Sequence, residues 1–541
     1  MRYPLILLFV FASYLSNGQA ILNVKDLGAV GDSTTDCTSY IQQAIDNLSQ
    51  AGGGIVLIDS GIYSITTIIL KSNITLKITP GTVLKGPAVD ASYPYIPYNT
   101  PSWPTYQYTQ QGMIFAEQAS NIRITGGGTI DGNGFQFDFL GVAKNFRPMV
   151  MRLHDINGLI IDSIKLRQSP QWMVHLMGCT NVHINAVDVY NQCWGVNDGI
   201  DIDCCKNVLV ENSHFDTNDD CIPVKTQAND SVCRDITIRN CTMATFERPV
   251  KVGCESFGPL INIRFQNITV NASSYSLSET PLNAIYIGIA DGGSADSIFI
   301  DSIKVNTLFT TPIFIRLCER DFQYDTTVPH QLPKYLRNVW ISNVTCPGTI
   351  IPSSVSGIQG YDAENIHLGG ISLTVPGGGP AVTGNLPGLD SLRPECNIWG
   401  DSLPAYGLFS WHVNGLFLDS FCVTTTSPDV RPEYYFIDTT NIPPFIMSNG
   451  CTANYNGIKD IEQPGFAVYP NPATDMVNVK NLPAPVEALI VYSMTGERVA
   501  MFATLGRANL SIPVGNLSAG VYILNALGNG YSANMRMVVV R

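Results

Sequence analysis

Three aspartates in the middle of the chain have the chemistry and the spacing that acid/base catalysis requires. Asp198 lies in the segment 196–201, and Asp219 and Asp220 follow it 21 and 22 positions later. Inverting hydrolysis of a glycosidic bond needs a carboxylic acid beside the leaving oxygen and a carboxylate that activates water on the opposite face of the sugar. If one coil of a repeating structure separates these aspartates, they can perform this chemistry together.

Carboxyl groups that crowd together also change one another's ionisation. Like charges a few ångströms apart resist joint ionisation, which raises at least one pKa and keeps an acid protonated near neutral pH. The alternative is structural, because an Asp at a turn often only caps backbone amides. For a single aspartate we favour the structural role, and for these three together we favour catalysis.

The spacing of the aspartates matches a repeat that occupies most of the chain. A polar residue, usually Asn, followed by β-branched residues recurs, and between residues 157 and 262 its steps are 24, 26, 28 and 27 residues. Each unit holds two or three short strands and has no room for the helix of a βαβ crossover. The sequence therefore predicts an all-β fold, a right-handed parallel β-helix in which residues one coil apart become neighbours.

The open N-terminal end of such a solenoid needs a cap. Apolar residues recur at helical spacing over residues 38–50, so the sequence predicts a capping helix there, with Asp36 or Thr38 as its N-cap. The apolar positions are Ile41, Ala44, Ile45 and Leu48.

The two ends of the chain differ from the repeat. One basic residue, a short apolar stretch and small residues predict a signal peptide over residues 1–19. The β-helix domain is expected over residues 20–455, a linker over 456–464 and a small β-sandwich over 465–541. No later segment is apolar for long enough to cross a membrane, so no membrane span is expected.

The composition limits the partners. A net charge of −13 disfavours nucleic acid and anionic membranes, so an acidic substrate would need a local basic patch. The 14 cysteines fit an oxidising compartment, and eight of them lie between residues 179 and 254. Since no CxxC pair accompanies them, we expect disulfides or buried thiols rather than zinc.

Two motifs one coil apart resemble a known family. Residues 197–201 (Asn-Asp-Gly-Ile-Asp) and 219–225 (Asp-Asp-Cys-Ile-Pro-Val-Lys) are similar to glycoside hydrolase family 28, the polygalacturonase family, and the likeness extends over roughly residues 22–420. The segments that flank the expected helix resemble the opening of the pectin-lyase-like β-helix superfamily. The resemblance implies an inverting enzyme with no metal or organic cofactor. By it, Asp219 would be the general acid, and Asp198 with Asp220 would activate water.

Two departures from the family affect the binding of a substrate carboxylate. Arg248 stands where the family has the histidine of Gly-His-Gly, and Tyr286 stands where the family begins Arg-Ile-Lys. Arg248 and Lys251 could rebuild the carboxylate site, because a guanidinium binds carboxylate or sulfate bidentately. Alternatively, Arg248 only pairs with the adjacent aspartates and holds the loop. Lys225 is a further candidate for substrate binding, or a solvated lysine on the next turn.

The aspartates and the resemblance together predict a secreted, inverting glycoside hydrolase of the polygalacturonase type. We expect a monomer that acts on a plant or algal polysaccharide or its oligosaccharides, with acidic sugars favoured. Two rivals stay open. A polysaccharide lyase on the same scaffold would use a base such as Arg248 beside calcium held by carboxylates, and a surface β-helix with a decayed site would only bind glycans.

The C-terminal residues resemble a second family. From residue 468 the sequence Val-Tyr-Pro-Asn-Pro-Ala opens a segment of alternating strands that is similar to the type A sorting domain of the type IX secretion system. The resemblance implies the secretion machinery as a partner and export through the periplasm to the cell surface or the medium. An adhesive or carbohydrate-binding β-sandwich is the alternative.

Overall fold

The computed structural model forms two compact units, residues 1–451 and 452–541, and each is described by itself. The expected signal peptide, apart from Gln19, and the expected linker over 456–464 lie outside the described residues. The structure describes residues 19–97, 111–139, 141–143, 147–193, 195–228, 231–274, 280–319, 331–379, 394, 403–443, 466–483, 486–493, 498–528 and 531–540.

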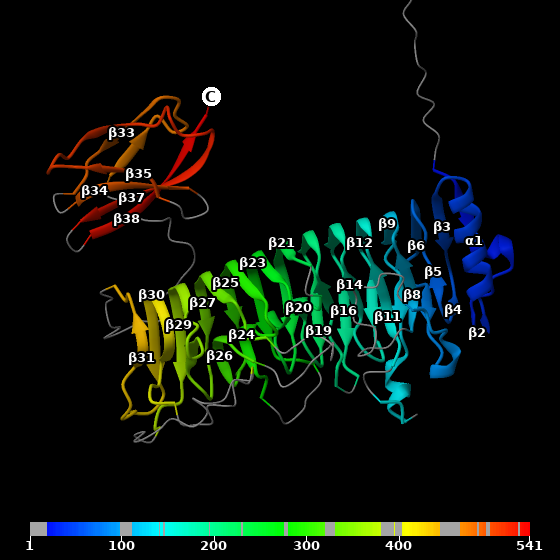
Figure 1. Ribbon diagram of the computed structural model, residues 1–541. Helices are drawn as coiled ribbons and strands as arrows, with labels where there is room; N and C mark the ends of the chain where they lie inside the picture. The colour runs from blue at the N-terminus through cyan, green and yellow to red at the C-terminus, as the bar shows by residue number, and fades with distance from the viewer. Residues whose placement is uncertain are drawn as a thin grey trace, which may run out of the picture. The chain divides into compact units, whose positions relative to one another are not determined.

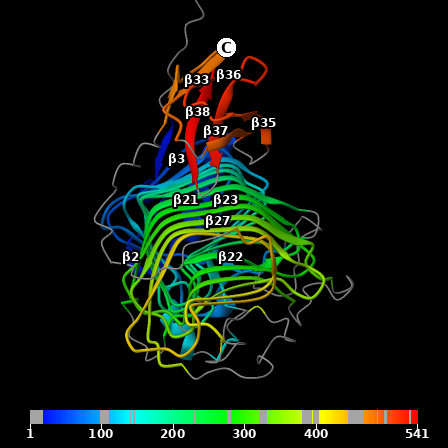
Figure 2. The same cartoon turned by 90° about the vertical axis from the view of Figure 1, so that its left-hand side faces the viewer.

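The first unit is a parallel β-helix whose strands pair with those of the coils before and after them (Figure 1). Figure 2 looks along the solenoid and shows the coils stacked on one another. The strands form three series. The first contains β1 (Ile21–Asn23), β3 (Gly54–Ile58), β6 (Ile74–Ile78), β9 (Ser120–Thr125), β12 (Asn157–Asp162), β15 (Thr180–Asn185), β18 (Lys206–Glu211), β21 (Cys233–Ala244), β23 (Pro259–Asn271), β25 (Ser294–Val305), β27 (Tyr335–Cys346), β29 (Ala363–Val375) and β30 (Leu408–Thr425).

The other two series complete each coil. The second contains β5 (Ile68–Ile69), β8 (Gly112–Glu117), β11 (Met149–His154), β14 (Val174–Met177), β17 (Ile200–Asp203), β20 (Ile222–Thr226), β22 (Val250–Ser256), β24 (Asn283–Ile289), β26 (Thr311–Leu317), β28 (Ser353–Ser356), the start of β30, and β31 (Tyr434–Thr440). The third contains β2 (Asp32–Asp36), β4 (Ile62–Ser64), β7 (Val83–Lys85), β10 (Thr129–Asp131), β13 (Lys165–Arg167), β16 (Asp188–Asn191) and β19 (His214–Thr217), and beyond β19 the longer strands β21 onward extend along it.

The polar residues that mark the repeat are stacked from coil to coil. The side-chain amide of Asn181 donates to Asn157 Oδ1 at 2.8 Å, and that of Asn207 donates to Asn181 Oδ1 at 2.7 Å. Asn181 and Asn207 have φ values of 57° and 55°, a left-handed conformation that Asn tolerates better than most residues. The repeat of Asn therefore reflects both a backbone turn and a side-chain ladder.

The aliphatic residues of each repeat face inward and stack in register. Val182 pairs with Val208, Val208 with Ile236 and Ile236 with Ile263, and all four are buried. Burial of these side chains on successive coils supplies the hydrophobic stabilisation that a single short repeat unit lacks. The predicted parallel β-helix is confirmed.

The predicted capping helix is present as α1 (Thr38–Gln50). Its buried residues are Ile41, Ala44, Ile45 and Leu48, as expected. The predicted N-cap is wrong by one residue, since the flanking position is Cys37, which makes no side-chain cap. Asp36 still binds a backbone amide at the start of the helix, because its Oδ1 accepts the Thr38 N–H at 2.9 Å. Short 3-10 helices cover Val24–Leu27, Asp90–Ser92 and Gly134–Phe139.

The central cysteines contribute to the core as thiols. Seven of the eight are buried, which agrees with buried thiols. They are Cys179, Cys193, Cys204, Cys205, Cys221, Cys233 and Cys241.

The second unit has two antiparallel sheets around their own core, as expected for the small C-terminal β-domain. Val477, Val491 and Leu524, from both sheets, are buried in one cluster. One sheet contains β32 (Ala467–Tyr469), β33 (Met476–Lys480) and β36 (Leu510–Pro513), and the other contains β34 (Val486–Ser493), β35 (Arg498–Ala503), β37 (Gly520–Gly528) and β38 (Tyr531–Val539). Within the described parts of the chain, no helix has the length and apolar character needed to cross a membrane.

Candidate active site

The three aspartates lie at the turns that precede two neighbouring strands of the second series. Asp198 comes just before β17, and Asp219 and Asp220 come just before β20. These strands pair in register, and the amide N–H of Gly199 donates to the carbonyl of Asp220 at 2.9 Å. The turns of successive coils are thus joined directly, and the coil spacing brings the acidic residues to the same place.

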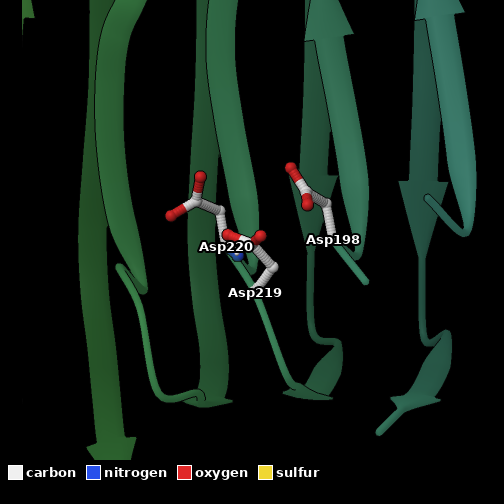
Figure 3. A group of neighbouring side chains, drawn as sticks. All are labelled: Asp198, Asp219 and Asp220. Atoms are coloured by element: carbon white, nitrogen blue, oxygen red, sulfur yellow. Dashed lines mark hydrogen bonds between the residues drawn. The ribbon is translucent and has the colours of Figure 1, made fainter. Parts of the chain in front are cut away.

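The carboxyl groups form one cluster. One oxygen from each of the three side chains lies within 4.8 Å of the others (Figure 3). Asp198 and Asp220 are buried, whereas Asp219 is partly exposed. Of the three, Asp219 is therefore the one most accessible to a group that approaches from solvent.

Backbone contacts fix the orientation of Asp219. Its carbonyl oxygen accepts the hydroxyl of Thr217 at 2.6 Å and also the hydroxyl of Thr245. Its Oδ1 accepts the amide N–H of Asp220 at 2.9 Å. The hydroxyls of Thr217 and Thr245 bind the backbone carbonyl of Asp219 and so hold the turn. They do not occupy Oδ2 of its carboxyl group.

Asp198 is held in the same way from the preceding coil. Its carbonyl oxygen accepts the side-chain amide of Asn191 at 2.9 Å and the backbone N–H of Met173 at 3.0 Å. The position of its carboxyl group is therefore set by the neighbouring strands rather than by a mobile loop.

Two cations lie beside Asp220. The Lys251 ammonium forms an ion pair with Oδ2 of Asp220. Nη1 of Arg248 lies 3.7 Å from Oδ1 of Asp220 and donates to Oε2 of Glu247 at 3.1 Å. The guanidinium carbon of Arg248 also lies 4.8 Å from the ring centroid of Tyr286. Both basic candidates thus lie beside the acidic cluster.

The electrostatics of the cluster favour a protonated acid. Burial and the charge of Asp220 raise the pKa of Asp219 to about 6, although Lys251 and Arg248 oppose the shift. Burial and the neighbouring carboxylates raise the pKa of Asp198 well above its usual value. Burial and Asp219 also raise the pKa of Glu247 to about 8. These shifts are those expected where several carboxyl groups share a partly desolvated site.

The carboxylates also change the pKa values of the two neighbouring cations. Burial alone would lower the pKa of Arg248 and of Lys251, but Asp220 raises both above their ordinary values. Both side chains therefore stay positively charged.

Lys225 lies behind the cluster and not on a solvated turn, so the interpretation as a solvated lysine is wrong. Its Nζ lies 2.5 Å from Oδ1 of Asp201, and the side chains are 1% and 0% exposed. The ammonium also lies 3.7 Å from the ring centroid of Trp172. We interpret this buried ion pair as part of the structure that holds the site in place.

Tyr286 is likewise buried. Its hydroxyl donates to the carbonyl of Pro394 at 3.0 Å, and its ring stacks on Phe314 with centroids 5.7 Å apart. Lys251 pairs with Tyr286 in strand register, so the altered Arg-Ile-Lys position has a lysine beside it on the neighbouring coil.

Three residues of the site were not singled out from the sequence. Asp201 belongs to the quoted motif, and strand alternation could have placed it near Asp198. Glu247 and Trp172 gave no spacing signal, because each lies at the irregular end of a coil.

The oxygens of Asp198, Asp219 and Asp220 are close enough together to bind a cation. The donor set suits a hard cation, since carboxylate oxygens are what calcium and magnesium prefer. Asp220, however, already binds the ammonium of Lys251, which supplies a positive charge at this position.

Comparisons with known proteins agree with this architecture. The model of glycosyl hydrolases family 28 matches residues 97–245, and that of the secretion system C-terminal sorting domain matches residues 467–540. A probable polygalacturonase of Vitis vinifera is 27% identical over 305 residues, 53% of this chain and 61% of the relative. The exo-poly-alpha-D-galacturonosidase of Dickeya chrysanthemi is 24% identical over 409 residues, 64% of this chain and 65% of the relative. The chain thus spans less than two thirds of the length of these relatives.

Solved structures share the fold. The exopolygalacturonase of Thermotoga maritima superimposes with a TM-score of 0.53 at 21% identity, over 66% of this chain and 87% of the other. The family 28 exopolygalacturonase of Yersinia enterocolitica gives a TM-score of 0.53 at 18% identity, over 79% of this chain and 78% of the other. The sorting domain indicates export to the cell surface or the extracellular space.

Proposed function

We propose that this chain, whose residues 97–245 match the model of glycosyl hydrolases family 28, is an exported hydrolase of O-glycosidic bonds in pectic polysaccharides of the galacturonan type. The observation that supports the proposal best is the gathering of three carboxyl groups within 4.8 Å at the turns of two adjacent coils. The relatives named above are polygalacturonases, which supports an acidic substrate.

The site residues divide the work of hydrolysis. Asp219, with its raised pKa and partial exposure, gives its proton to the leaving glycosidic oxygen as the bond to the anomeric carbon breaks. Asp198 and Asp220 accept hydrogen bonds from a water whose oxygen forms the new bond, and one of them takes its proton. Carboxylate oxygens no more than 4.8 Å apart can share one water at ordinary hydrogen-bond distances.

Arg248 is the best candidate for binding the acidic group of the substrate. Its Nε is buried and has no hydrogen-bond partner among the described residues, and its side chain is still 12% exposed. Lys251 is less available, because its ammonium is bound to Asp220. In this proposal Lys251 compensates the charge of Asp220, and Lys225 and Tyr286 support the site without touching the substrate.

The stereochemistry of the product is a first prediction. The carboxyl oxygens of the three aspartates lie within 4.8 Å of one another. This separation is closer to that of the two catalytic carboxyl groups in retaining enzymes, about 5–5.5 Å, than to that in inverting enzymes, about 6.5–9.5 Å. We nevertheless propose inversion, because Lys251 and Arg248 neutralise Asp220, which makes it a poor nucleophile toward the anomeric carbon. Proton NMR of the first product formed should show the opposite anomer from the substrate. Retention of configuration would contradict this mechanism and identify one carboxylate as a nucleophile.

The pH dependence of the reaction is a second prediction. The general acid must be protonated, so kcat/KM should fall as the pH rises through about 6, the pKa of Asp219. It should also fall at acidic pH, because the carboxyl group that takes the proton from water must be ionised. Initial rates across this range, on protein whose folding is checked at each pH, would give the bell-shaped profile. A rate that stays constant from pH 6 to pH 8 would contradict the assignment of Asp219.

The lyase alternative is less well supported. A lyase needs a base that removes a proton, and Arg248 and Lys251, with raised pKa values, remain protonated. Incubation with pectins, rhamnogalacturonans and sulfated glycans separates the alternatives. New reducing ends support the hydrolase, an ultraviolet-absorbing unsaturated product supports the lyase, and binding without product supports the decayed glycan-binding protein.

The C-terminal unit gives the route of export. We infer that the type IX secretion machinery recognises the sorting domain and that the enzyme works outside the cell or on its surface.

A further inference from the structure

The guanidinium of Arg248 has two carboxylates beside its Nη1. This nitrogen donates to Oε2 of Glu247 at 3.1 Å and lies 3.7 Å from Oδ1 of Asp220. Asp220 is 2% exposed and is already paired with Lys251, whereas the side chain of Glu247 is 33% exposed. Of the two carboxylates, Glu247 is therefore the one that a ligand from solvent meets together with Arg248.

The hydrogen bond to Glu247 occupies the edge of Arg248 that a ligand would need. A guanidinium binds a carboxylate through two N–H groups of one edge, either Nε with Nη2 or Nη1 with Nη2. The Nε atom of Arg248 is buried, so the first edge is closed to a carboxylate that arrives from solvent. The second edge includes Nη1, which donates to Glu247. An acidic sugar can therefore form the bidentate pair only if Glu247 releases Nη1.

The backbone holds Glu247 at this position. Its amide N–H donates to Oγ1 of Thr245 at 3.0 Å, and the same hydroxyl donates to the carbonyl of Asp219. The carbonyl of Glu247 accepts the amide N–H of Asn283 at 3.4 Å. The residue is thus tied to the turn of the general acid and to the following coil, and a change of partner requires only a rotation of its side chain.

Other contacts keep Arg248 in place when Glu247 lets go of it. Its carbonyl accepts the amide N–H of Cys221 at 3.2 Å, and its guanidinium carbon lies 4.8 Å from the ring centroid of Tyr286. Asp220 also remains beside it. The loss of the Glu247 contact therefore leaves a positioned cation that can bind another carboxylate.

The ionisation of Glu247 depends on charged groups from two coils. Asp219 and Asp220 face it from the preceding coil, and Arg248 and Lys251 belong to its own coil. Burial and the charge of Asp219 raise the pKa of Glu247 to about 8, although the two cations oppose the shift. Below this pH the carboxyl group is protonated and holds Arg248 more weakly, because a neutral oxygen is a weaker acceptor than a carboxylate.

We propose that Glu247 determines how well this site accepts an acidic sugar: its carboxylate holds Nη1 of Arg248 before a ligand binds, and the acidic group of the sugar replaces it there. The inference rests on the proposed function and adds a specificity-determining residue to it. No covalent bond changes in the exchange. A sugar without a carboxylate cannot replace Glu247, so this residue should affect acidic ligands alone.

Galacturonate and galactose are suitable probes, because these monosaccharides differ in the carboxylate and neither contains a linkage to cleave. The variant is Glu247→Gln, which keeps the shape of the side chain and removes its charge. At about pH 9, where Glu247 is ionised, NMR titration should show that the variant binds galacturonate about fivefold more tightly than the wild type. At about pH 6 the two proteins should bind galacturonate alike, and their affinities for galactose should be equal at both pH values.

Glu211→Gln is the matched control. Glu211 also pairs with an arginine, Arg239 at 2.7 Å, but on strands of the first series. This variant should bind galacturonate as the wild type does. The inference would be overturned by equal or weaker galacturonate binding in Glu247→Gln at about pH 9, by the same gain for galactose or in Glu211→Gln, or by the absence of galacturonate binding in every protein.

The double variant Glu247→Gln/Arg248→Gln shows whether the gain depends on Arg248. Without the guanidinium there is no cation for galacturonate to take from Glu247, so the double variant and Arg248→Gln should bind it equally weakly. A gain that persists in the double variant would overturn the inference, because it would reflect only the lower negative charge of the site. Hydrolysis is a separate measurement: no product from any pectic glycan would overturn the hydrolase function, and these titrations need no product.

Discussion

The Asp219→Asn variant should hydrolyse its glycan about 10²- to 10⁴-fold more slowly than the wild type, because Asn has nearly the same shape but no acidic proton to give. The fold should be unaffected. Thr217 and Thr245 bind the backbone carbonyl of residue 219, and the Asn side-chain oxygen can still accept the amide N–H of Asp220. Initial rates of reducing-end release, together with thermal unfolding of both proteins, measure the effect.

Asp235→Asn is a chemically identical change at a structural position. Asp235 is exposed, and its Oδ1 accepts the side-chain amide of Asn262 at 2.7 Å, in the ladder where other coils have Asn. We expect this variant to keep the wild-type rate. If it loses as much activity as Asp219→Asn, or if Asp219→Asn stays fully active, Asp219 is not the general acid.

The parts of the fold that could be predicted are those that repeat. In a parallel β-helix one coil of sequence brings a residue back to the same face, so the steps from Asn157 through Asn181 to Asn207 defined the ladder. The same rule placed Asp198 beside Asp219, since these residues are also about one coil apart. Regular spacing is thus sufficient to predict which residues of successive coils lie next to one another.

The parts that could not be predicted depend on segments outside the repeat. Pro394 and Leu403 cover the second series from a position far along the chain, and no periodicity relates them to Tyr286. Glu247 has a perturbed pKa because of burial and Asp219, which a sequence does not reveal. Irregular segments decide burial, and burial decides part of the electrostatics.

Lys225 illustrates the same limit for a single side chain. The sequence Asp-Asp-Cys-Ile-Pro-Val-Lys leaves a solvated lysine and a substrate-binding lysine equally open. In the structure Lys225 lies over Trp172 and pairs with Asp201, so it is buried and not solvated. The coil that holds the catalytic candidates thus also holds a buried counterion for the preceding coil.

Replacing Lys225 with Met should lower the free energy of unfolding of the β-helix by about 3–5 kcal/mol, because the Asp201 carboxylate would stay buried without its cation. Met preserves an unbranched side chain of similar length beside Trp172. Urea unfolding followed by tryptophan fluorescence measures the loss. Lys25→Met is the control, since Lys25 also pairs with an aspartate, Asp59 at 3.0 Å, but in solvent, and its removal should cause no measurable change.

The double variant Lys225→Met/Asp201→Asn separates charge from packing. With both charges removed, no uncompensated ion remains in the interior, so most of the stability lost in Lys225→Met should return. Equal destabilisation in the single and the double variant would instead show that the lysine acts through packing alone. The single variant should also reduce hydrolysis, because an uncompensated Asp201 raises the pKa of the adjacent Asp198 further and leaves it less often ionised to activate water.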